Sequence, residues 1–230
     1  MEETMKKTQA SAQNDSGSRS FAAGLNFYKL FWIFMIGCFL GTILEMIFCF
    51  VTQHGLIESR SGLIYGPFNP VYGFGAVVLT IVLRPLAHKR DLIIFLFSLV
   101  IGSGFEYLCS AFQQYFMGTV SWDYSNLPLN IGGRTCLLYG LFWGILGLLW
   151  VKDIYPYFSK WIEKIPNKVG VVLTWVLVVF MVFNMAISAL AVQRWDQRDH
   201  GVKADNSFEE FLDKTYPDDF MRKIYPNMIL

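Results

Sequence analysis

Two glutamates stand inside long apolar stretches of this sequence, where an ionised side chain is costly. Glu45 lies in FLGTILEMIFCF and Glu106 in IGSGFEYLCSAF, and an arginine follows each stretch, Arg60 or Arg134. A charge inside a membrane is disfavoured unless it is paired, so we expect each glutamate to be protonated or neutralised by a partner. The arginines are the expected partners, because a guanidinium presents a planar fork of donors that suits carboxylate or phosphate.

The two arginines begin the same phrase, RSGLIYG at residues 60–66 and RTCLLYG at residues 134–140. Each copy places a tyrosine, Tyr65 or Tyr139, about one helical turn deeper than its arginine. We predict that the glutamates, arginines and tyrosines form one ligand site between two helical hairpins. A purely architectural role is equally open, because intramembrane ion pairs often lock helices together.

The elements that would position these residues are membrane helices. The chain has 230 residues, of which 54% are hydrophobic and 16% charged, and the apolar residues occur in blocks. This composition is typical of a membrane protein. Five blocks are long enough to cross a hydrocarbon core, which needs about 20 helical residues. They are residues 27–51, 63–83, 92–117, 136–151 and 169–192. The predicted fold class is an all-α integral membrane protein with five transmembrane helices.

The distribution of Lys and Arg predicts an orientation for these spans. The basic residues are more numerous on the side that holds the N-terminus, which places the N-terminus in the cytoplasm and the C-terminal tail outside. Residues 1–24 are predicted to be a disordered cytoplasmic tail, 25–193 the transmembrane domain, and 194–230 an extracytoplasmic amphipathic tail. The net charge of +1 gives no indication of a nucleic-acid partner.

The spans contain an internal repeat. The first and third spans carry small residues and a glutamate at steps of four, and the returning spans match at the arginine phrase. The matched positions are Gly37, Gly41, Glu45 and Cys49 with Ser98, Gly102, Glu106 and Ser110, and Arg60, Tyr65, Gly66, Phe68 and Gly73 with Arg134, Tyr139, Gly140, Phe142 and Gly147. We predict two tandem hairpins, residues 27–83 and 92–151, related as a parallel repeat, plus a fifth helix at 169–192. Both glutamates would then face protein, at one depth in the outer half of the membrane.

The second predicted span contains a break. Pro67 and Pro70 prevent one regular helix from running through it, so residues 66–70, with Asn69 among them, are a candidate cavity wall. A kink used only for packing is equally open, since proline is common in membrane helices.

The loop before Arg134 reads TVSWDYSNLPLNIGGR and carries two further candidate residues, Trp122 and Asp123. It could fold over the outer mouth of the site as a lid. It could equally be an interfacial loop anchored by its aromatic residues, with Asp123 capping a turn.

The sequence lacks the motifs that nucleotide binding and metal binding would need. No GxxxxGK[ST] phosphate loop occurs, so ATP cannot be bound by that route. His54, His88 and His200 lack ligand spacing, and neither a metal nor a cofactor is assigned. All four cysteines fall in or beside spans and are expected to be buried small hydrophobes, with a Cys109–Cys136 bridge left open.

Several stretches together resemble a known family. LIYGPFNPVYGFGAV, FEYL, and WDYSNLPLNIGGR followed by CLLYGLFWGILGLL are similar to the putative ABC-transporter type IV membrane family, as is the tail with its YPNM. The resemblance is best over residues 30–165. It implies a multi-pass protein of the bacterial plasma membrane that is labelled a permease. It implies neither a substrate nor particular functional residues.

The sequence thus favours a permease subunit of a transporter, with the Glu/Arg site between the repeats. Five spans are few for a pore, so a homodimer in the membrane lipid is expected, with a separate ATP-binding subunit as the energy source. The alternative is a non-transport membrane protein, regulatory or structural, whose arginines bind an anionic lipid head group or an extracellular ligand. An enzyme acting on lipid or cell-wall precursors is least favoured, because no nucleophile or metal accompanies the carboxylates.

Overall fold

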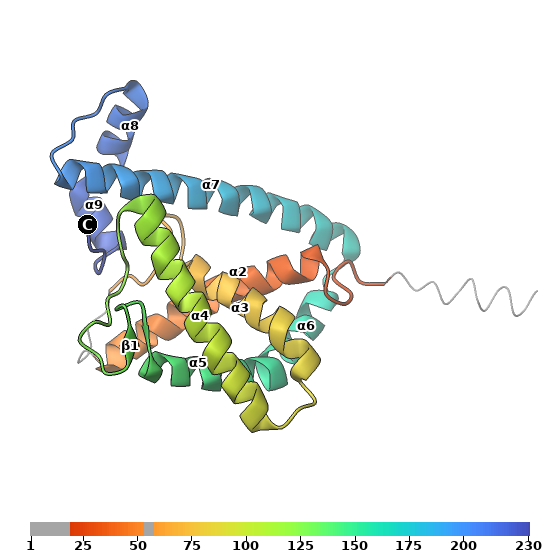
Figure 1. Ribbon diagram of the computed structural model, residues 1–230. Coiled ribbons are helices and arrows are strands. Elements are labelled where there is room, and N and C mark those ends of the chain that lie inside the picture. Colours follow the sequence, from red (N-terminus) through yellow and green to blue (C-terminus); the bar gives the residue numbers. More distant parts are fainter. Residues whose placement is uncertain (1–18, 53–57) are drawn as a thin grey trace, which may run out of the picture.

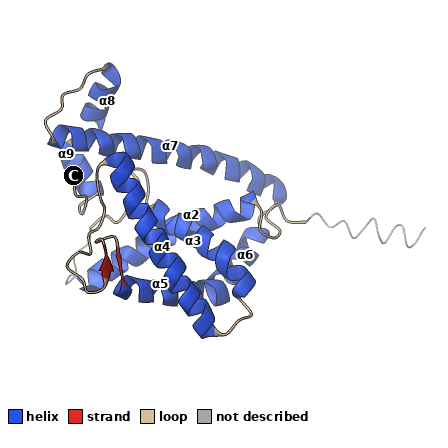
Figure 2. Ribbon diagram, viewed as in Figure 1, coloured by secondary structure: helices blue, strands red, loops and turns tan. Residues whose placement is uncertain are grey.

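The computed structural model describes residues 19–52 and 58–230, which form a mostly helical molecule (Figures 1 and 2). Its long helices are α2 (Phe27–Thr52), α3 (Pro70–Leu83), α4 (Asp91–Met117), α5 (Leu137–Leu149) and α7 (Asn167–Asp199). The shorter elements are the 3-10 helix η1 (Arg84–Leu86), the antiparallel strands β1 (Asn130–Ile131) and β2 (Thr135–Cys136), the π-helical turn η2 (Trp150–Ile154), α6 (Tyr155–Glu163), α8 (Ser207–Thr215) and α9 (Asp218–Ile224). Most of the predicted N-terminal tail, residues 1–18, lies outside the described residues.

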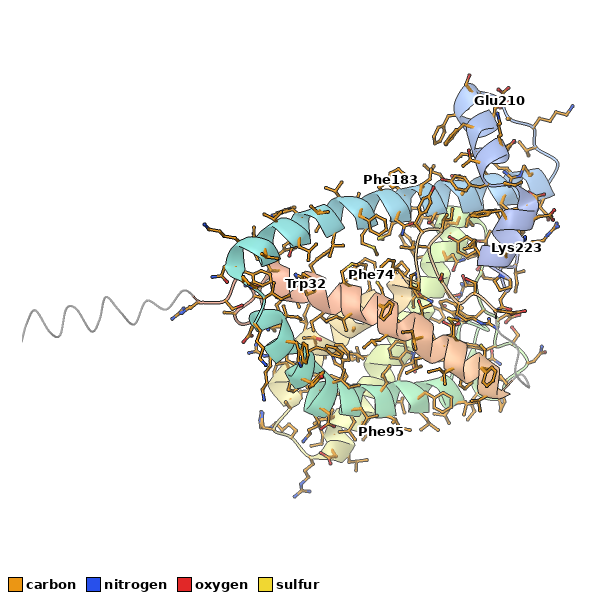
Figure 3. The ribbon with its side chains drawn as sticks, turned by 180° about the vertical axis from the view of Figure 1, so that it is seen from behind. Trp32, Phe74, Phe95, Phe183, Glu210 and Lys223 are labelled. Carbon is orange, nitrogen blue, oxygen red and sulfur yellow. The ribbon has the colours of Figure 1, made fainter. Side chains whose placement is uncertain are left out.

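Within the described part of the chain, four helical segments are long and apolar enough to cross a membrane. They are Phe27–Thr52, Asp91–Met117, Leu137–Glu163 and Asn167–Asp199. Large apolar side chains project from them, as Phe183 does from α7 (Figure 3). An apolar surface of this extent is expected to face lipid rather than water, which identifies a membrane protein.

The second predicted span, residues 63–83, is not a single helix. α3 begins only at Pro70, and its 14 residues rise about 21 Å, less than a hydrocarbon core of about 30 Å. Pro70 stands at the start of the helix, where its missing N–H costs nothing, and Asn69 caps that end by accepting from the N–H of Val71 at 3.1 Å. Four of the five predicted spans are therefore present, and an irregular segment with a short helix replaces the second.

The two predicted hairpins pack through small residues, α3 on α2 and α5 on α4. A Cβ on Gly37 would lie 3.1 Å from the Cα of Gly73, and a Cβ on Gly147 would lie within overlap distance of Ser98 Oγ. These contacts join positions that the repeat treats as equivalent. Close approach of this kind is how small residues stabilise helix pairs without a hydrophobic driving force between them.

The returning arms of the hairpins nevertheless differ. α5 begins at Leu137, shortly after Arg134, whereas α3 begins at Pro70, well after Arg60. The residues that follow Arg60 and those that follow Arg134 therefore have different backbone conformations. The parallel repeat and the orientation in the membrane stay predictions.

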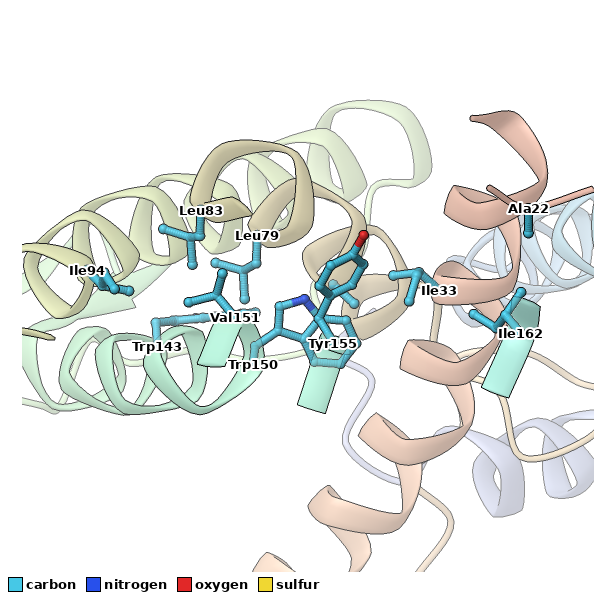
Figure 4. Close-up of a cluster of buried hydrophobic side chains, with 11 residues drawn as sticks. Ala22, Ile33, Leu79, Leu83, Ile94, Trp143, Trp150, Val151, Tyr155 and Ile162 are labelled. Carbon is cyan, nitrogen blue, oxygen red and sulfur yellow. The ribbon is translucent and has the colours of Figure 1, made fainter. Parts of the chain in front are cut away.

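A buried apolar cluster fixes the two hairpins against each other. Leu79 of α3 and Ile94 of α4 belong to this cluster together with Trp143 of α5 and Trp150 of η2 (Figure 4). The indole N–H of Trp150 donates to Thr80 Oγ1 at 2.8 Å, so its polar atom is satisfied within the cluster.

The first turn of α2 is attached to the connection between α5 and α7. Lys29 is fully buried, and its Nζ contacts the backbone carbonyl of Ser159 at 3.1 Å and the carboxylate of Glu163. Just before α2, the N–H of Phe21 donates to Asn167 Oδ1 at 2.7 Å. The start of α2, α6 and the start of α7 thus form one end of the bundle.

An irregular segment, residues 58–69, leads into α3, and α7 satisfies its backbone. Asn184 pairs with Tyr65, accepting from its N–H at 3.1 Å and donating to its carbonyl at 2.7 Å. The preceding N–H, that of Ile64, donates to Ser188 Oγ at 3.0 Å. Non-helical backbone at membrane depth is tolerated only with such partners, and two polar residues on α7 provide them.

The C-terminal tail docks on the end of α7 through an ion-pair network. The Arg194 side chain is 2% exposed and donates from Nε and Nη2 to both carboxylate oxygens of Asp213, at 2.8 and 2.9 Å. Arg198 donates to Asp213 at 2.6 Å and to Asp218 at 2.8 Å. Paired N–H···O bonds of this kind are the strong form of an arginine–carboxylate contact, so they hold α8 and α9 in place.

We expect Asp213→Asn to release the tail from α7, because Arg194 would stay buried without its carboxylate. The cost should be about 3 kcal/mol of docking free energy, seen as a lower unfolding midpoint and faster trypsin cleavage after α7. The matched control is Asp219→Asn, which removes a pair with Arg222 at an Asp side chain that is 92% exposed. Equal behaviour of the two variants would contradict the network's role.

The same contact should weaken in acid. Hydrogen bonds from Arg194 above all, and then from Arg198, hold the pKa of Asp213 below its usual range, against the opposing effect of burial. Since the pKa is lower in the folded state, the contact contributes its full stability above about pH 4 and loses it as the pH falls through the lowered pKa. The difference in unfolding midpoint between wild type and Asp213→Asn should therefore be constant at neutral pH and shrink below about pH 4. A difference that persists undiminished at about pH 2 would argue against this assignment.

Candidate functional site

Glu106 is the most deeply buried carboxylate of the candidate site. It projects from α4, is 7% exposed, and accepts hydrogen bonds from Thr135 Oγ1 at 2.8 Å and Tyr124 Oη at 3.2 Å. Trp143 of α5 also contacts it. Burial raises the pKa of Tyr124, so this phenol stays protonated and serves as a donor. Hydroxyl groups from the loop and from β2 therefore solvate the carboxylate in place of water.

Glu45 lies on α2 and is half-buried. Its carboxylate accepts from Asn69 Nδ2 at 3.4 Å, and Tyr72 of α3 contacts it. Tyr72 also lies close enough to Glu106 to interact with it electrostatically. Both glutamates that the sequence singled out therefore interact with this one tyrosine.

Arg60 is buried in the irregular segment, with its side chain 6% exposed. It forms an ion pair with Glu58 at 3.2 Å and interacts electrostatically with Glu45. Its backbone carbonyl accepts from Asn69 Nδ2 at 3.4 Å, so one amide connects the Arg60 backbone with the Glu45 carboxylate.

Arg134 is placed differently from the prediction. It donates to Ser110 Oγ at 3.3 Å and to Gln114, and its guanidinium lies 5.7 Å from the centre of the Tyr107 ring. These partners lie on α4, beyond Glu106 toward the end of the helix. The expected pairing of Arg134 with Glu106 is therefore wrong, because Thr135 and Tyr124 occupy that carboxylate.

Tyr65 and Tyr139, the tyrosines of the two copies of the repeated phrase, also lie in different parts of the structure. Tyr139 stacks on Tyr124, with ring centres 4.4 Å apart and planes 15° from parallel, so it borders the Glu106 pocket. Tyr65 turns away, toward Phe183 of α7 and the tail, where its hydroxyl lies 2.8 Å from that of Tyr216. Only Tyr139 joins the carboxylates.

The two loop residues have local roles. Trp122 donates from its indole N–H to the carbonyl of Arg134 at 2.9 Å, which closes the loop on itself. Asp123 is exposed and caps a turn by accepting from the N–H and hydroxyl of Ser125, which lowers the pKa of Asp123. Asp123 thus caps a turn, which is one of the roles that the sequence left open for it. Tyr124, between them, is the loop residue that reaches the site.

Sequence reasoning missed three of the residues around the carboxylates. Tyr72, Tyr124 and Thr135 make direct contacts with the glutamates. Thr135 had a signal, because a hydroxyl residue follows the arginine in both copies of the phrase, as Ser61 or Thr135. The two tyrosines had none beyond their aromatic character, since their positions depend on how α3 and the loop pack.

An apolar groove runs along the bundle. Its volume is about 410 Å³, and it lies between α2, α3 and α5 and continues to η2. Its walls include Leu40, Leu44, Ile47, Leu79, Leu146 and Trp150. Tyr72 and Trp143 also line it, and these are the residues that contact Glu45 and Glu106 respectively. Two wall residues therefore connect the groove with the glutamates, which do not line it themselves.

The described residues contain no cluster of three or more His, Cys, Asp or Glu side chains that could hold a metal. The four cysteines, including Cys109 and Cys136, are free thiols. The site is therefore one of carboxylates, phenols and an adjoining apolar surface.

Comparison with known proteins identifies the family. The family described as putative ABC-transporter type IV matches residues 32–189, well over half of the chain. This chain belongs to that family. The match includes both glutamates, the irregular segment and most of α7, and it ends before the docked tail. The resemblance drawn from the sequence is confirmed, and the protein is an ABC-transporter-related membrane protein. No curated protein and no solved structure matches the chain.

We expect Tyr124→Phe in this type IV family member to destabilise the protein by about 1–2 kcal/mol, because Glu106 loses one of its two hydroxyl donors. The measurement is the unfolding midpoint in mild detergent. Tyr115→Phe is the matched control, since the Tyr115 side chain is 82% exposed. A Tyr124→Phe midpoint equal to that of the control would mean that the hydroxyl does not support the carboxylate.

Proposed function

We propose that this protein is the membrane-embedded permease subunit of a transporter, driven by a separate ATP-hydrolysing subunit. Family membership is the observation that carries the proposal. Two facts support it: the bundle contains four long apolar helices, and the sequence contains no GxxxxGK[ST] phosphate loop. A transporter built on this chain therefore needs its nucleotide site on a partner.

The substrate site of this permease is proposed to lie around Glu45 and Glu106. The carboxylates are held between the two hairpins, and the irregular segment lies beside them with its backbone bonded to α7. In transporters, broken helices beside a buried polar site are the usual place where substrate contacts backbone and side chains at membrane depth. A homodimer would provide the further helices that a translocation path needs.

A second candidate function is a non-transport protein that binds a membrane lipid for a regulatory or structural purpose. The apolar groove beside the carboxylates is the observation that favours it. Both functions use the same site. They differ in whether the protein works with an ATPase.

Affinity purification of the tagged protein from its native membrane, in mild detergent, tests the transport proposal. We expect a subunit with a phosphate-loop sequence to co-purify in stoichiometric amount, and the complex to hydrolyse ATP. Light scattering of that complex would give the number of copies of this chain, with two expected. Recovery of the chain alone, from cells that retain its activity and after cross-linking before extraction, would refute the transport proposal and favour the lipid-binding function.

A further inference from the structure

The short helix α8 leaves two phenylalanines uncovered. Phe208 and Phe211 are 49% and 51% exposed, and their rings stack with centres 6.4 Å apart. Positions three apart share one side of a helix, so the two rings form a single apolar surface. Leu212, by contrast, is 2% exposed and belongs to the same buried cluster as Ala191 and Trp195 of α7. One side of α8 is thus packed on α7, and a neighbouring apolar side is open.

The helix α8 lies at the level where α7 leaves the apolar part of a membrane. The mainly apolar run of α7, from Val169 to Val192, rises about 35 Å, enough to cross a hydrocarbon core of about 30 Å. Val192 is therefore expected near the boundary of that core. Asp213 of α8 pairs with Arg194, two residues beyond Val192. α8 is thus placed at the interface between hydrocarbon and water, and it stands out sideways from the end of α7 (Figure 1).

The ion pairs of the tail decide which way the open side of α8 faces. Asp213 pairs with both Arg194 and Arg198, and Arg198 lies one turn farther from the apolar run of α7. The side of α8 that carries Asp213 is therefore turned toward the polar end of α7. Successive residues of a helix point about 100° apart, so Phe211 and Asp213 project to opposite flanks of α8 when Leu212 faces α7. The phenylalanine side is thus turned back toward the apolar run and the lipid around it.

We propose that α8 is an interfacial anchor, whose Phe208 and Phe211 insert into the lipid leaflet at the C-terminal end of α7. Helices that lie in this interface bury an aromatic or leucine-rich side about 5–10 Å into the boundary between head groups and acyl chains. The anchor fixes the depth of α7, whose Asn184 and Ser188 hold the irregular segment. The inference goes beyond transport, because it needs only the membrane class of the protein.

Spin labelling of the full chain tests the proposal. Phe208→Cys and Glu210→Cys each receive a nitroxide label, and both residues are exposed, so neither change should move the unfolding midpoint. Two residues apart, the labels project to nearly opposite sides of α8. The protein is reconstituted in phosphatidylcholine vesicles, since α8 has two acidic residues in its first turn and one basic residue in its last, which gives no reason to require anionic lipid. Wild type, treated with the same reagent, gives the background of the native cysteines.

The measurement is the collision rate of each label with oxygen, which concentrates in the bilayer, divided by its collision rate with a water-soluble nickel chelate. We expect this ratio to be about tenfold higher for the label at Phe208 than for the label at Glu210. Adding Phe211→Ser to the Phe208→Cys variant should lower the ratio, because half of the apolar surface is lost. Phe97→Ser is the matched control, since Phe97 of α4 is 50% exposed and remote from the tail in the sequence, and it should leave the ratio unchanged.

Equal ratios at the two labelled positions would overturn the proposal, whether both labels lie in water or both lie in lipid. Spin–spin broadening of the Phe208 label that disappears on dilution with unlabelled protein would also overturn it, because a second copy of the chain would then cover the phenylalanines. The comparison of the two labels decides even where the Phe211→Ser variant fails to fold. Because no ATPase takes part, failure of this test and failure of the co-purification are separate results.

Discussion

The structure depends on one constraint, which is that backbone amides outside a helix cannot remain unbonded inside a membrane. Residues 58–69 are not helical and precede α3, so side chains of α7 supply hydrogen bonds to their backbone. Asn184 and Ser188 place α7 against this segment, although α7 has apolar side chains over much of its surface. Asn69 then ends the segment by capping α3. The break thereby fixes both the position of α7 and the start of α3.

The same break brings the candidate site together. Because α3 starts late, Tyr72 lies in its first turn, at the level where Gly41 of α2 lets the tyrosine approach closely. A residue larger than glycine at that position would overlap the Tyr72 side chain. Packing against Gly41 thus fixes Tyr72 beside Glu45, and Asn69 contributes both the helix cap and a contact to Glu45. Structural roles and the proposed binding role thus fall on the same few side chains.

The charges of the chain are used in two different ways. At the tail, arginines pair directly with aspartates at an interface that water can reach, and the pairs serve to dock α8 and α9. At the site, Glu106 accepts from the hydroxyls of Thr135 and Tyr124, whereas Glu45 accepts from the Asn69 amide and interacts electrostatically with Arg60. A carboxylate held by neutral donors keeps its ability to bind a cation, whereas a carboxylate in a bidentate arginine pair does not. This difference is the physical basis for proposing a binding role for the cluster around the glutamates and a structural role for the cluster at the tail.

The sequence by itself determined the membrane class, four of the helices and the placement of Glu45 and Glu106 within two of them, because long apolar runs have few other physical explanations. It also located the break near Pro67 and Pro70, since proline removes the donor that a continuous helix needs. Only the tertiary structure decided which groups meet the carboxylates. The repeated phrase predicted that Arg134 would pair with Glu106. An arginine side chain is long enough to reach partners one turn away, and Arg134 donates instead to Ser110 and Gln114. The donors that replace it, Tyr124 and Thr135, come from a loop and a two-residue strand whose paths are set by packing and carry no periodic signal in the sequence.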